Sequence, residues 1–211
     1  MALTDIAHKT DIREAVMDSA ERLFARYGYK KTTVEDIASD IRISRATLYL
    51  HFHSKEEIAL CWIGRFNEGL QVELRDIANE DCNPIDRLKH MLVVRVMKVF
   101  NHASRYSESI DDLLAALRPS LMKQRQQKHE AESNIFAGVI LEGQSTGKFV
   151  HGDPVELARL LIDATNSLLP YNLSAQQLGE PELMERKINA LAHLLLNGME
   201  TRDMNPEREM N

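Results

Sequence analysis

The chain has 211 residues, of which 44% are hydrophobic and 27% charged, as in ordinary globular proteins. Only 6 Pro and 9 Gly occur, so long helices can run uninterrupted. The 2 Cys form no C-x-x-C pair, which argues against a disulfide framework or a thiolate zinc site and fits a reducing compartment. The sequence shows no signal peptide, and no apolar run approaches the roughly 18 residues of a membrane span. We therefore expect a cytoplasmic protein with no membrane partner.

The net charge of −6 is distributed unevenly. Residues 1–55 carry 9 Lys/Arg and 8 Asp/Glu, a net charge of +1, and the remainder carries −7. The stretch 42–55 contains Arg42, Arg45 and Lys55 and no acidic residue. Because phosphate attraction is screened beyond about 8–10 Å at physiological salt, a local patch of this kind is enough for a DNA-binding surface. The alternative is that any helix end collects a few charges.

Several helix starts are crowded into the first 55 residues. Short helices need tertiary partners, so this segment is predicted to form a small compact domain. Each expected helix follows a residue that caps helix N-termini: Asp11 for 11–27, Thr33 for 34–41, Ser44 for 45–52 and Ser54 for a longer helix.

The longer helix is predicted to run from Lys55 to about Ala78, with an apolar residue at every fourth position from Ile58. At 1.5 Å per residue it is about 35 Å long, so it must leave the small domain and connect it to a second one. Pro and Gly positions predict helices over 84–102, 107–117, 119–143, 154–169 and 181–199, with loops over 143–153 and 170–180.

These elements predict an all-α chain of about nine helices in two domains. The first is an N-terminal three-helix helix-turn-helix domain at 1–54, and the second is a helical bundle domain at 55–200. A polar tail at 201–211 is expected to be disordered.

Residues 33–55 show the apolar pattern of a helix-turn-helix. Ile37 and Ala38 face inward on the first short helix, and Leu48 and Phe52 face inward on the second. The outward face of the second helix carries cations and hydroxyl groups without a carboxylate. Such a face suits insertion into a DNA major groove, with phosphates on both sides.

This stretch resembles the TetR family of transcriptional regulators. The matching residues are Thr33, Ile37, Ala38, Ile43, Ser44, Thr47, Leu48, Tyr49, His51, Phe52, Ser54, Lys55, Glu56 and Glu57. Ile41, Arg42 and Ala46 depart from the family, which usually has Ala, Gly and Gly there. The resemblance implies a ligand-released repressor that binds a palindromic operator in double-stranded DNA as a homodimer, without a cofactor and without enzymatic activity.

Nine residues are predicted to lie at the DNA: Thr33, Arg42, Ser44, Arg45, Ala46, Thr47, Tyr49, His51 and Lys55. Arg45 is the expected reader of a guanine edge, and the methyl group of Ala46 can touch a thymine methyl. Thr33, at a helix N-terminus, and Lys55 are expected to contact phosphates, which set register but carry no sequence preference.

Two aromatic side chains of the second short helix have two interpretations. By resemblance to the family, Tyr49 and His51 contact phosphates. From the residues alone, Tyr49 can equally be half-buried packing, and His51 can simply cap the helix end.

The last two predicted helices are apolar on more than one face, which a one-sided surface helix does not need. A second copy of the chain is the economical partner, and the resemblance implies a four-helix bundle across a two-fold axis. The alternative is burial within the monomer itself. The residues expected in the dimer interface are Leu161, Leu168, Ile188, Leu191, Leu195 and Met199.

The resemblance also implies a pocket for a small apolar or amphipathic effector in the second domain. Met and Phe side chains suit an adaptable apolar site, and they suit an ordinary core equally well. Four polar residues at or near the apolar faces can orient a ligand or reach solvent, namely Arg95, His102, Asn134 and Asn166. The candidate lining residues are Trp62, Phe66, Met91, Val94, Arg95, Phe100, Leu113, Leu117, Phe136, Ile140 and Asn166.

An enzyme and a helical interaction protein are the alternative classes. The sequence has no H-E-x-x-H, G-x-S-x-G, Walker or Rossmann motif, and its 8 His are scattered, so neither catalysis nor a metal site is indicated. The cationic face around Arg45 and Lys55 argues against a protein that kept the fold and lost DNA binding.

Overall fold

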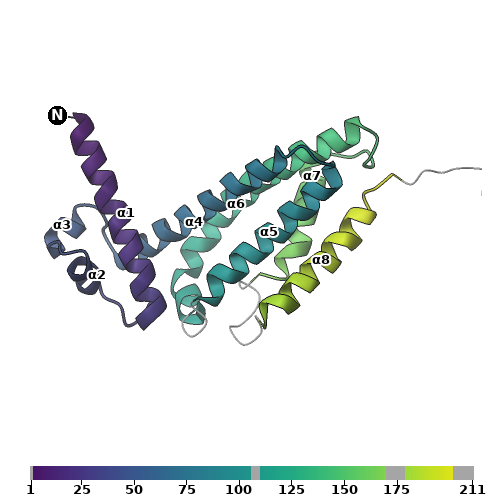
Figure 1. Cartoon of the computed structure of the whole chain (residues 1–211). Helices are drawn as coiled ribbons and strands as arrows, with labels where there is room; N and C mark the ends of the chain where they lie inside the picture. The colour runs from purple at the N-terminus through teal and green to yellow at the C-terminus, as the bar shows by residue number, and fades with distance from the viewer. Residues whose placement is uncertain (1, 106–109, 170–178, 202–211) are drawn as a thin grey trace, which may run out of the picture.

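The chain is almost entirely helical, which confirms the predicted fold class. The computed structural model describes residues 2–105, 110–169 and 179–201, and these residues form eight α-helices and no strand. Figure 1 shows α1–α3 at one end of a bundle built from the other helices. The helices are α1 (Ala2–Tyr27), α2 (Val34–Asp40), α3 (Arg45–Tyr49), α4 (Lys55–Ala78), α5 (Pro84–Ser104), α6 (Ile110–Ser145), α7 (Pro154–Asn166) and α8 (Pro181–Asn197).

The first helix is longer than its sequence pattern indicated. It begins at Ala2, so Asp11 lies inside α1 and does not cap it; the predicted start was wrong. No Gly or Pro interrupts residues 2–10, and extending a nucleated helix by one residue costs little. Farther along, Val16 and Phe24 are buried and fix α1 against the rest of the domain.

Side-chain caps start the two short helices where the sequence predicts them. Thr33 Oγ1 accepts from Asp36 N at 3.1 Å, and the Asp36 carboxylate accepts from Thr33 N at 2.8 Å, which together form a capping box at α2. Ser44 Oγ accepts from Thr47 N at 3.0 Å at the start of α3. These caps satisfy backbone donors that helices of this length otherwise leave without partners.

Two apolar cores share α4. The N-terminal core joins α1–α3 to the first turns of α4 and takes in Ala103, Leu113 and Leu117 from α5 and α6. The C-terminal core joins the later turns of α4, including Leu70 and Leu74, to α5–α8. The long helix therefore belongs to both cores, as its length predicts.

Pro119 lies inside a continuous helix instead of opening a new one. The helices expected over 107–117 and 119–143 are joined in α6. Proline has no N–H and disfavours a helix interior, but the chain is held on both sides of it. Leu117 is fully buried on one side, and Ser120 donates to a Glu56 carboxylate oxygen at 2.7 Å on the other. These contacts with α1–α4 come from distant parts of the sequence, so the local pattern did not reveal them.

The turn between α6 and α7 packs closely against its own helix. A Cβ atom on Gly143 would lie 2.0 Å from the ring of Phe149, so only glycine fits there. Phe149 is fully buried, and Val150 N donates to Met199 O at 2.8 Å, which ties this turn to the end of α8.

Two predictions concern segments outside the described residues: most of the loop over 170–180, and the tail over 201–211 apart from Thr201. Within the described part of the chain, no helix is long and apolar enough to cross a membrane.

Candidate nucleic-acid interface and effector domain

The predicted DNA contacts gather on one surface of α2, α3 and their flanking turns. Leu48 and Phe52 are fully buried beneath α3, and Ala38 on α2 is only 3% exposed where the two helices meet. The side opposite these residues faces solvent, and Figure 1 shows α3 at the outer end of the molecule. Six predicted contacts are exposed there, namely Thr33, Arg42, Ser44, Arg45, Ala46 and Tyr49, and three are partly buried, namely Thr47, His51 and Lys55.

Arg42 occupies the tight turn between the two short helices. Its φ is +58°, a left-handed conformation that favours glycine and costs other residues roughly 1 kcal/mol. Arg42 N donates to Ser39 O at 3.1 Å and Ile43 N donates to Ala38 O at 3.0 Å, which hold the turn closed. The departure from glycine noted in the sequence therefore strains the backbone and leaves an exposed cation beside α3.

Thr33 has no donor free for a phosphate in this structure. Its backbone N–H and its hydroxyl both donate to the Asp36 carboxylate, at 2.8 and 2.7 Å. The same two hydrogen bonds, the hydroxyl's first, lower the pKa of Asp36, so this carboxylate stays charged. A phosphate at this helix end would have to use the N–H groups of the first turn of α2, beyond Thr33.

Ser44 and Thr47 are engaged with each other. Their hydroxyl oxygens lie 2.8 Å apart, and Ser44 also accepts from Thr47 N. Both side chains therefore define the start of α3, and a DNA contact by either would have to share this hydrogen bond.

Arg45 lies between two side chains. One of its terminal nitrogens pairs with a Glu35 carboxylate oxygen, and the other donates to Tyr49 Oη at 3.3 Å. The hydrogen bond to Tyr49 and the charge of Glu35 raise the pKa of Arg45. Tyr49 is 37% exposed, so its side chain is accessible at the surface while its ring lies beside Arg45. The sequence did not reveal Glu35, because its partner lies on the next helix.

Lys55 has a role that its sequence position did not indicate. Its Nζ donates to Tyr29 O at 2.8 Å and to Thr32 O at 2.9 Å, and it lies 4.4 Å from the centre of the Tyr29 ring. Burial lowers the pKa of Lys55. Because an ammonium has three donors, one is left for the predicted phosphate contact. The main role of Lys55 in this structure is to hold the turn between α1 and α2 against α4.

Arg13 supports the end of α3 and was missed by the sequence interpretation. It donates to His51 O at 2.5 Å, and its guanidinium carbon lies 4.1 Å from the centre of the Phe52 ring. Its second terminal nitrogen contacts Cys61 Sγ at 3.4 Å. No local pattern marks Arg13, because all three partners are far along the chain.

The predicted effector-pocket residues lie in two different interiors. Three belong to the N-terminal core, namely Trp62, Leu113 and Leu117. Six belong to or pack against the C-terminal core, namely Phe66, Met91, Val94, Phe100, Phe136 and Ile140. The structure therefore does not bring all of them to one chamber, because α4 and α6 each pass through both cores.

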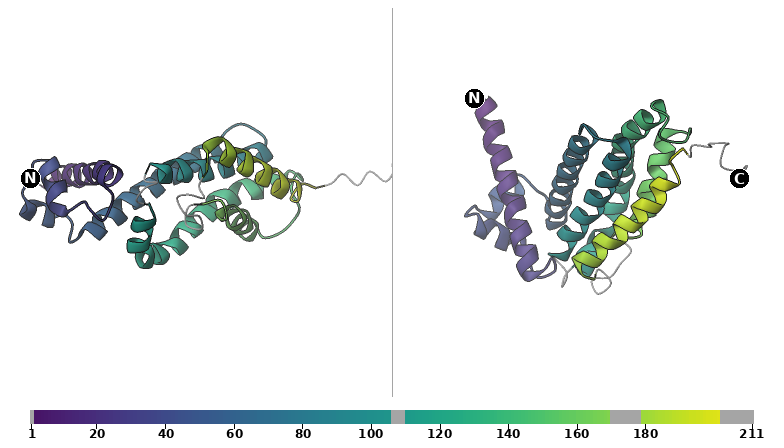
Figure 2. Two further views of the ribbon diagram at one scale, coloured as in Figure 1. Left: turned by 90° about the horizontal axis from the view of Figure 1, so that it is seen from below. Right: turned by 45° about the vertical axis from the view of Figure 1, so that its right-hand side comes forward.

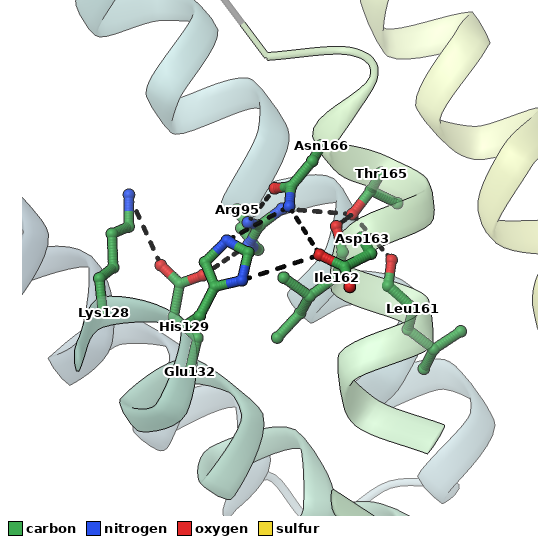
Figure 3. Close-up of polar contacts among 9 residues, drawn as sticks. All are labelled: Arg95, Lys128, His129, Glu132, Leu161, Ile162, Asp163, Thr165 and Asn166. Carbon is green, nitrogen blue, oxygen red and sulfur yellow. Dashed lines mark hydrogen bonds and ion pairs between the residues drawn. The ribbon is translucent and has the colours of Figure 1, made fainter. Parts of the chain in front are cut away.

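The two polar candidates, Arg95 and Asn166, are part of a buried polar cluster shown in Figure 3. Arg95 donates to Glu132 at 2.8 Å through Nε, to Thr165 Oγ1 at 3.2 Å and to Asn166 Oδ1 at 2.7 Å. The Arg95 side chain is 2% exposed and that of Glu132 is 0% exposed. Arg95 therefore joins α5, α6 and α7 and does not reach solvent.

The cluster continues toward the surface of α7. Asn166 Nδ2 donates to Asp163 at 3.2 Å, and His129 Nδ1 lies 3.7 Å from the same carboxylate. Burial raises the pKa of Glu132, but the positive charges of Arg95 and Lys128 outweigh burial, so the pKa is lowered overall and Glu132 is an anion. The cluster thus holds opposite charges beside the apolar C-terminal core.

His102 lies where α5 meets α4. Its ring stacks on Phe66, with centroids 4.0 Å apart, and is tilted against Trp62 at 5.0 Å. Trp62 in turn meets Phe24 of α1 edge to face at 6.1 Å. Burial lowers the pKa of His102 to about 4, so the ring is neutral at physiological pH. This row of rings connects α5 to the DNA-binding helices.

A surface groove of about 580 Å³ lies between α4 and α6. Its lining residues are Arg75, Ala78, Asn79, Ala131, Asn134, Ile135, Gly138, Val139 and Glu142. Of the residues considered for the effector pocket, only Asn134 lines this groove, and none of the apolar candidates does.

Three of the six residues predicted for the dimer interface are buried in the monomer. Leu161, Ile188 and Met199 are at most 7% exposed and belong to the monomer's own C-terminal core. They point inward because α7 turns its apolar stripe mainly toward α6, and α8 turns its own toward α5. Leu168, Leu191 and Leu195 are partly buried and remain candidates.

The outward faces of α7 and α8 carry other leucines. Leu160 is 61% exposed, Leu194 is 71% exposed and Leu183 is 41% exposed. Figure 2 shows α8 along the outside of the bundle. Leu160 and Leu194 directly precede the predicted Leu161 and Leu195, a difference of about 100° around the helix axis.

The N-terminal part of the chain matches a known protein family. Residues 16–60 match the family model described as "Bacterial regulatory proteins, tetR family", a range that holds much of α1, all of α2 and α3 and the start of α4. The fold and this surface together define a helix-turn-helix DNA-binding regulator.

Similarity to individual proteins extends over most of the chain. The HTH-type transcriptional repressor KstR2 of Mycobacterium tuberculosis is 28% identical over 180 residues, which cover 81% of this chain and 88% of that protein. The fatty acid metabolism regulator protein of Bacillus subtilis is 28% identical over 158 residues, covering 71% and 77%. The crystal structure of a transcriptional regulator from Cytophaga hutchinsonii gives a TM-score of 0.74 at 27% identity, covering 89% of this chain and 98% of that one. The chain is accordingly a DNA-binding transcriptional regulator, and its N-terminal part is similar to the tetR family.

Proposed function

We propose that this chain is a repressor that binds an inverted-repeat operator as a homodimer and is released by a small apolar or amphipathic effector. The observation that carries the proposal is the outward face of α3. Arg45, Ala46 and Tyr49 are exposed there on a helix whose opposite face is fully buried at Leu48. A rigidly backed helix with one exposed edge fits a major groove.

Dimerisation is supported by the exposed leucines of α7 and α8. Leu160 and Leu194 are more than half exposed on neighbouring helices, which is costly for a monomer in water. A two-fold axis beside these helices would bury both leucines and present two copies of α3 to DNA. Their half-sites would then be about 34–36 Å apart, or a longer groove repeat.

Release by an effector is supported by contacts that join the bundle to the DNA-binding helices. Lys30 in the turn after α1 pairs with Asp112 of α6 at 2.5 Å, and Ser120 of α6 donates to Glu56 of α4. An effector that shifts α6 or α5 would move these contacts and with them α3. Its effect is limited to its difference in affinity for the two arrangements, typically about 1–3 kcal/mol.

The name of the Bacillus subtilis relative refers to fatty acid metabolism, so fatty acids are the first probes for an amphipathic effector. The experiment measures fluorescence anisotropy of DNA from upstream of the chain's own gene while fatty acids of increasing length are added. The proposal predicts that at least one chain length lowers DNA affinity, and that saturating DNA weakens binding of that fatty acid by the same factor. A fatty acid that binds equally well with and without DNA is not the proposed effector. If the protein stays bound to this DNA with every fatty acid of the series, release by fatty acids is wrong.

A further inference from the structure

Glu35 is an exposed carboxylate beside α3, although the outward face of α3 itself carries no acidic residue. Its carboxylate pairs with one terminal nitrogen of Arg45 across the gap between α2 and α3. From the other side, Tyr49 accepts a hydrogen bond from the second terminal nitrogen at 3.3 Å, and its ring centre lies 5.3 Å from the guanidinium carbon. Arg45 therefore has a partner on each side.

We infer that Glu35 determines sequence specificity: together with Tyr49 it holds the Arg45 guanidinium in one orientation, so that Arg45 reads a guanine edge instead of a phosphate. This inference rests on the proposed use of α3 in the major groove. Glu35 acts through Arg45 and is a positioning residue.

Arg45 has enough N–H donors to bind Glu35 and Tyr49 and to contact a guanine edge at the same time. A guanidinium has five N–H donors, and one is used toward Glu35 and one toward Tyr49. Three remain, and a bidentate contact with guanine O6 and N7 needs two. An arginine side chain without such partners samples many rotamers, whose ordering on DNA costs free energy.

The charge of Glu35 acts against binding to the wrong sequence. A free Arg45 would be attracted by any phosphate, whatever the base sequence. Glu35 neutralises that attraction and is itself repelled by the phosphates. The repulsion is offset only where Arg45 gains a good base contact, so poor sites are penalised more than good ones.

The ion pair between Glu35 and Arg45 contributes little to the stability of the fold. The Arg45 and Glu35 side chains are 61% and 50% exposed, and surface pairs of this kind contribute little to stability. The hydrogen bond from Ile43 N to Ala38 O already holds the turn between α2 and α3, and Leu48 of α3 is fully buried in the domain core. The pair gains strength when DNA displaces the surrounding water and lowers the local dielectric.

The test uses the full-length protein and a library of random double-stranded DNA, from which bound sequences are selected for wild type and for Glu35→Gln. For Glu35→Gln we expect tighter binding to unselected DNA with a steeper salt dependence, and about a tenfold loss of discrimination at one base pair of each half-site. Tyr49→Phe should lose discrimination at the same base pair, by a smaller factor. Glu35→Asp, which keeps the charge, should recover part of it.

Two controls separate positioning from charge. Glu68→Gln removes the same charge from the exposed side of the neighbouring helix α4 and should leave discrimination at every base pair unchanged. On an Arg45→Ala background, Glu35→Gln should have no further effect on discrimination.

The outcomes divide cleanly. If Glu35→Gln tightens binding to all sequences equally, Glu35 is only a negative charge and the inference is wrong. If Glu35→Gln and Tyr49→Phe act at different base pairs, the shared role in orienting Arg45 is wrong. If wild type itself selects no sequence, the proposed function is wrong. If wild type is selective and Glu35→Gln keeps the same specificity, only the inference about Glu35 is wrong.

Discussion

Arg95 donates through Nε to Glu132 at 2.8 Å, with both side chains almost completely excluded from solvent. Burying two charges costs several kcal/mol each, so such a pair adds little net stability but becomes a liability when one partner is lost. Arg95 also holds Thr165 and Asn166 of α7 (Figure 3). The pair therefore specifies how α5, α6 and α7 fit together.

Glu132→Ala should lower the free energy of unfolding by about 3–5 kcal/mol, because Arg95 then remains charged and buried without its partner. The double variant Arg95→Met, Glu132→Leu should recover most of that loss, since it removes both charges and keeps apolar volume. Urea denaturation followed by circular dichroism measures both. A single variant as stable as wild type would show that Arg95 finds another anion or water.

Arg42→Gly should raise the free energy of unfolding by about 0.5–1 kcal/mol, because glycine adopts a φ of +58° without a Cβ penalty. Arg42→Ala is the matched control, since it removes the same side chain and keeps the strain. If both variants change stability equally, the effect comes from the side chain and not from the backbone. The two variants should weaken DNA binding by the same factor and reduce its salt dependence equally, because each removes one exposed cation.

Local signals carried the N-terminal predictions. Thr33 and Ser44 each precede an apolar helical pattern, and each caps the helix that follows it. The spacing of Leu48 and Phe52 is enough to predict that both face inward, and both are buried. Contacts between helices were not accessible in this way. The pairing of Glu35 with Arg45 depends on how α2 crosses α3, which no short pattern encodes.

Leu194→Glu should give a folded monomer, because a charge in a desolvated two-fold interface is expensive and Leu194 contributes little to the core at 71% exposure. Val72→Glu on α4, where the side chain is 54% exposed, is the control and should leave the oligomeric state unchanged. Sedimentation velocity at micromolar concentration distinguishes monomer from dimer for each variant. A wild type that sediments as a monomer would remove the basis for this prediction.

Leu160 is more exposed than Leu161, and Leu194 is more exposed than Leu195, a difference that the sequence pattern could not predict. Both members of each pair are apolar, and only the packing of α7 and α8 against α5 and α6 decides which faces outward. That packing depends on rotations of about 100° per residue, which periodicity cannot resolve in a helix that is apolar on several faces.

His102 should make the stability of the protein depend on pH. Burial lowers its pKa to about 4 from an ordinary 6.5, so below pH 6.5 the unfolded chain takes up a proton that the folded chain does not. The free energy of unfolding is therefore undiminished above pH 6.5, falls as the pH drops through 6.5, and has lost this contribution, at most about 3 kcal/mol, near pH 4.

His102→Phe keeps an aromatic ring between Trp62 and Phe66 and removes the titration. Between pH 7 and pH 5 wild type should lose up to about 2 kcal/mol more stability than the variant, followed by Trp62 fluorescence during urea unfolding. Carboxylates titrate in both proteins and cancel in the comparison. Equal losses in the two proteins would mean that His102 is not kept neutral by its surroundings.

The central claim is that this chain recognises a specific DNA sequence through α3 as a symmetric dimer. Selection of bound duplexes from random double-stranded DNA, with wild type and Arg45→Ala side by side, tests it most directly. We predict that wild type enriches an inverted repeat and that Arg45→Ala enriches the same repeat with one base pair relaxed in each half-site, at a cost of about 1–3 kcal/mol on the best sequence. Enrichment of no sequence, or of one without two-fold symmetry, would contradict the claim.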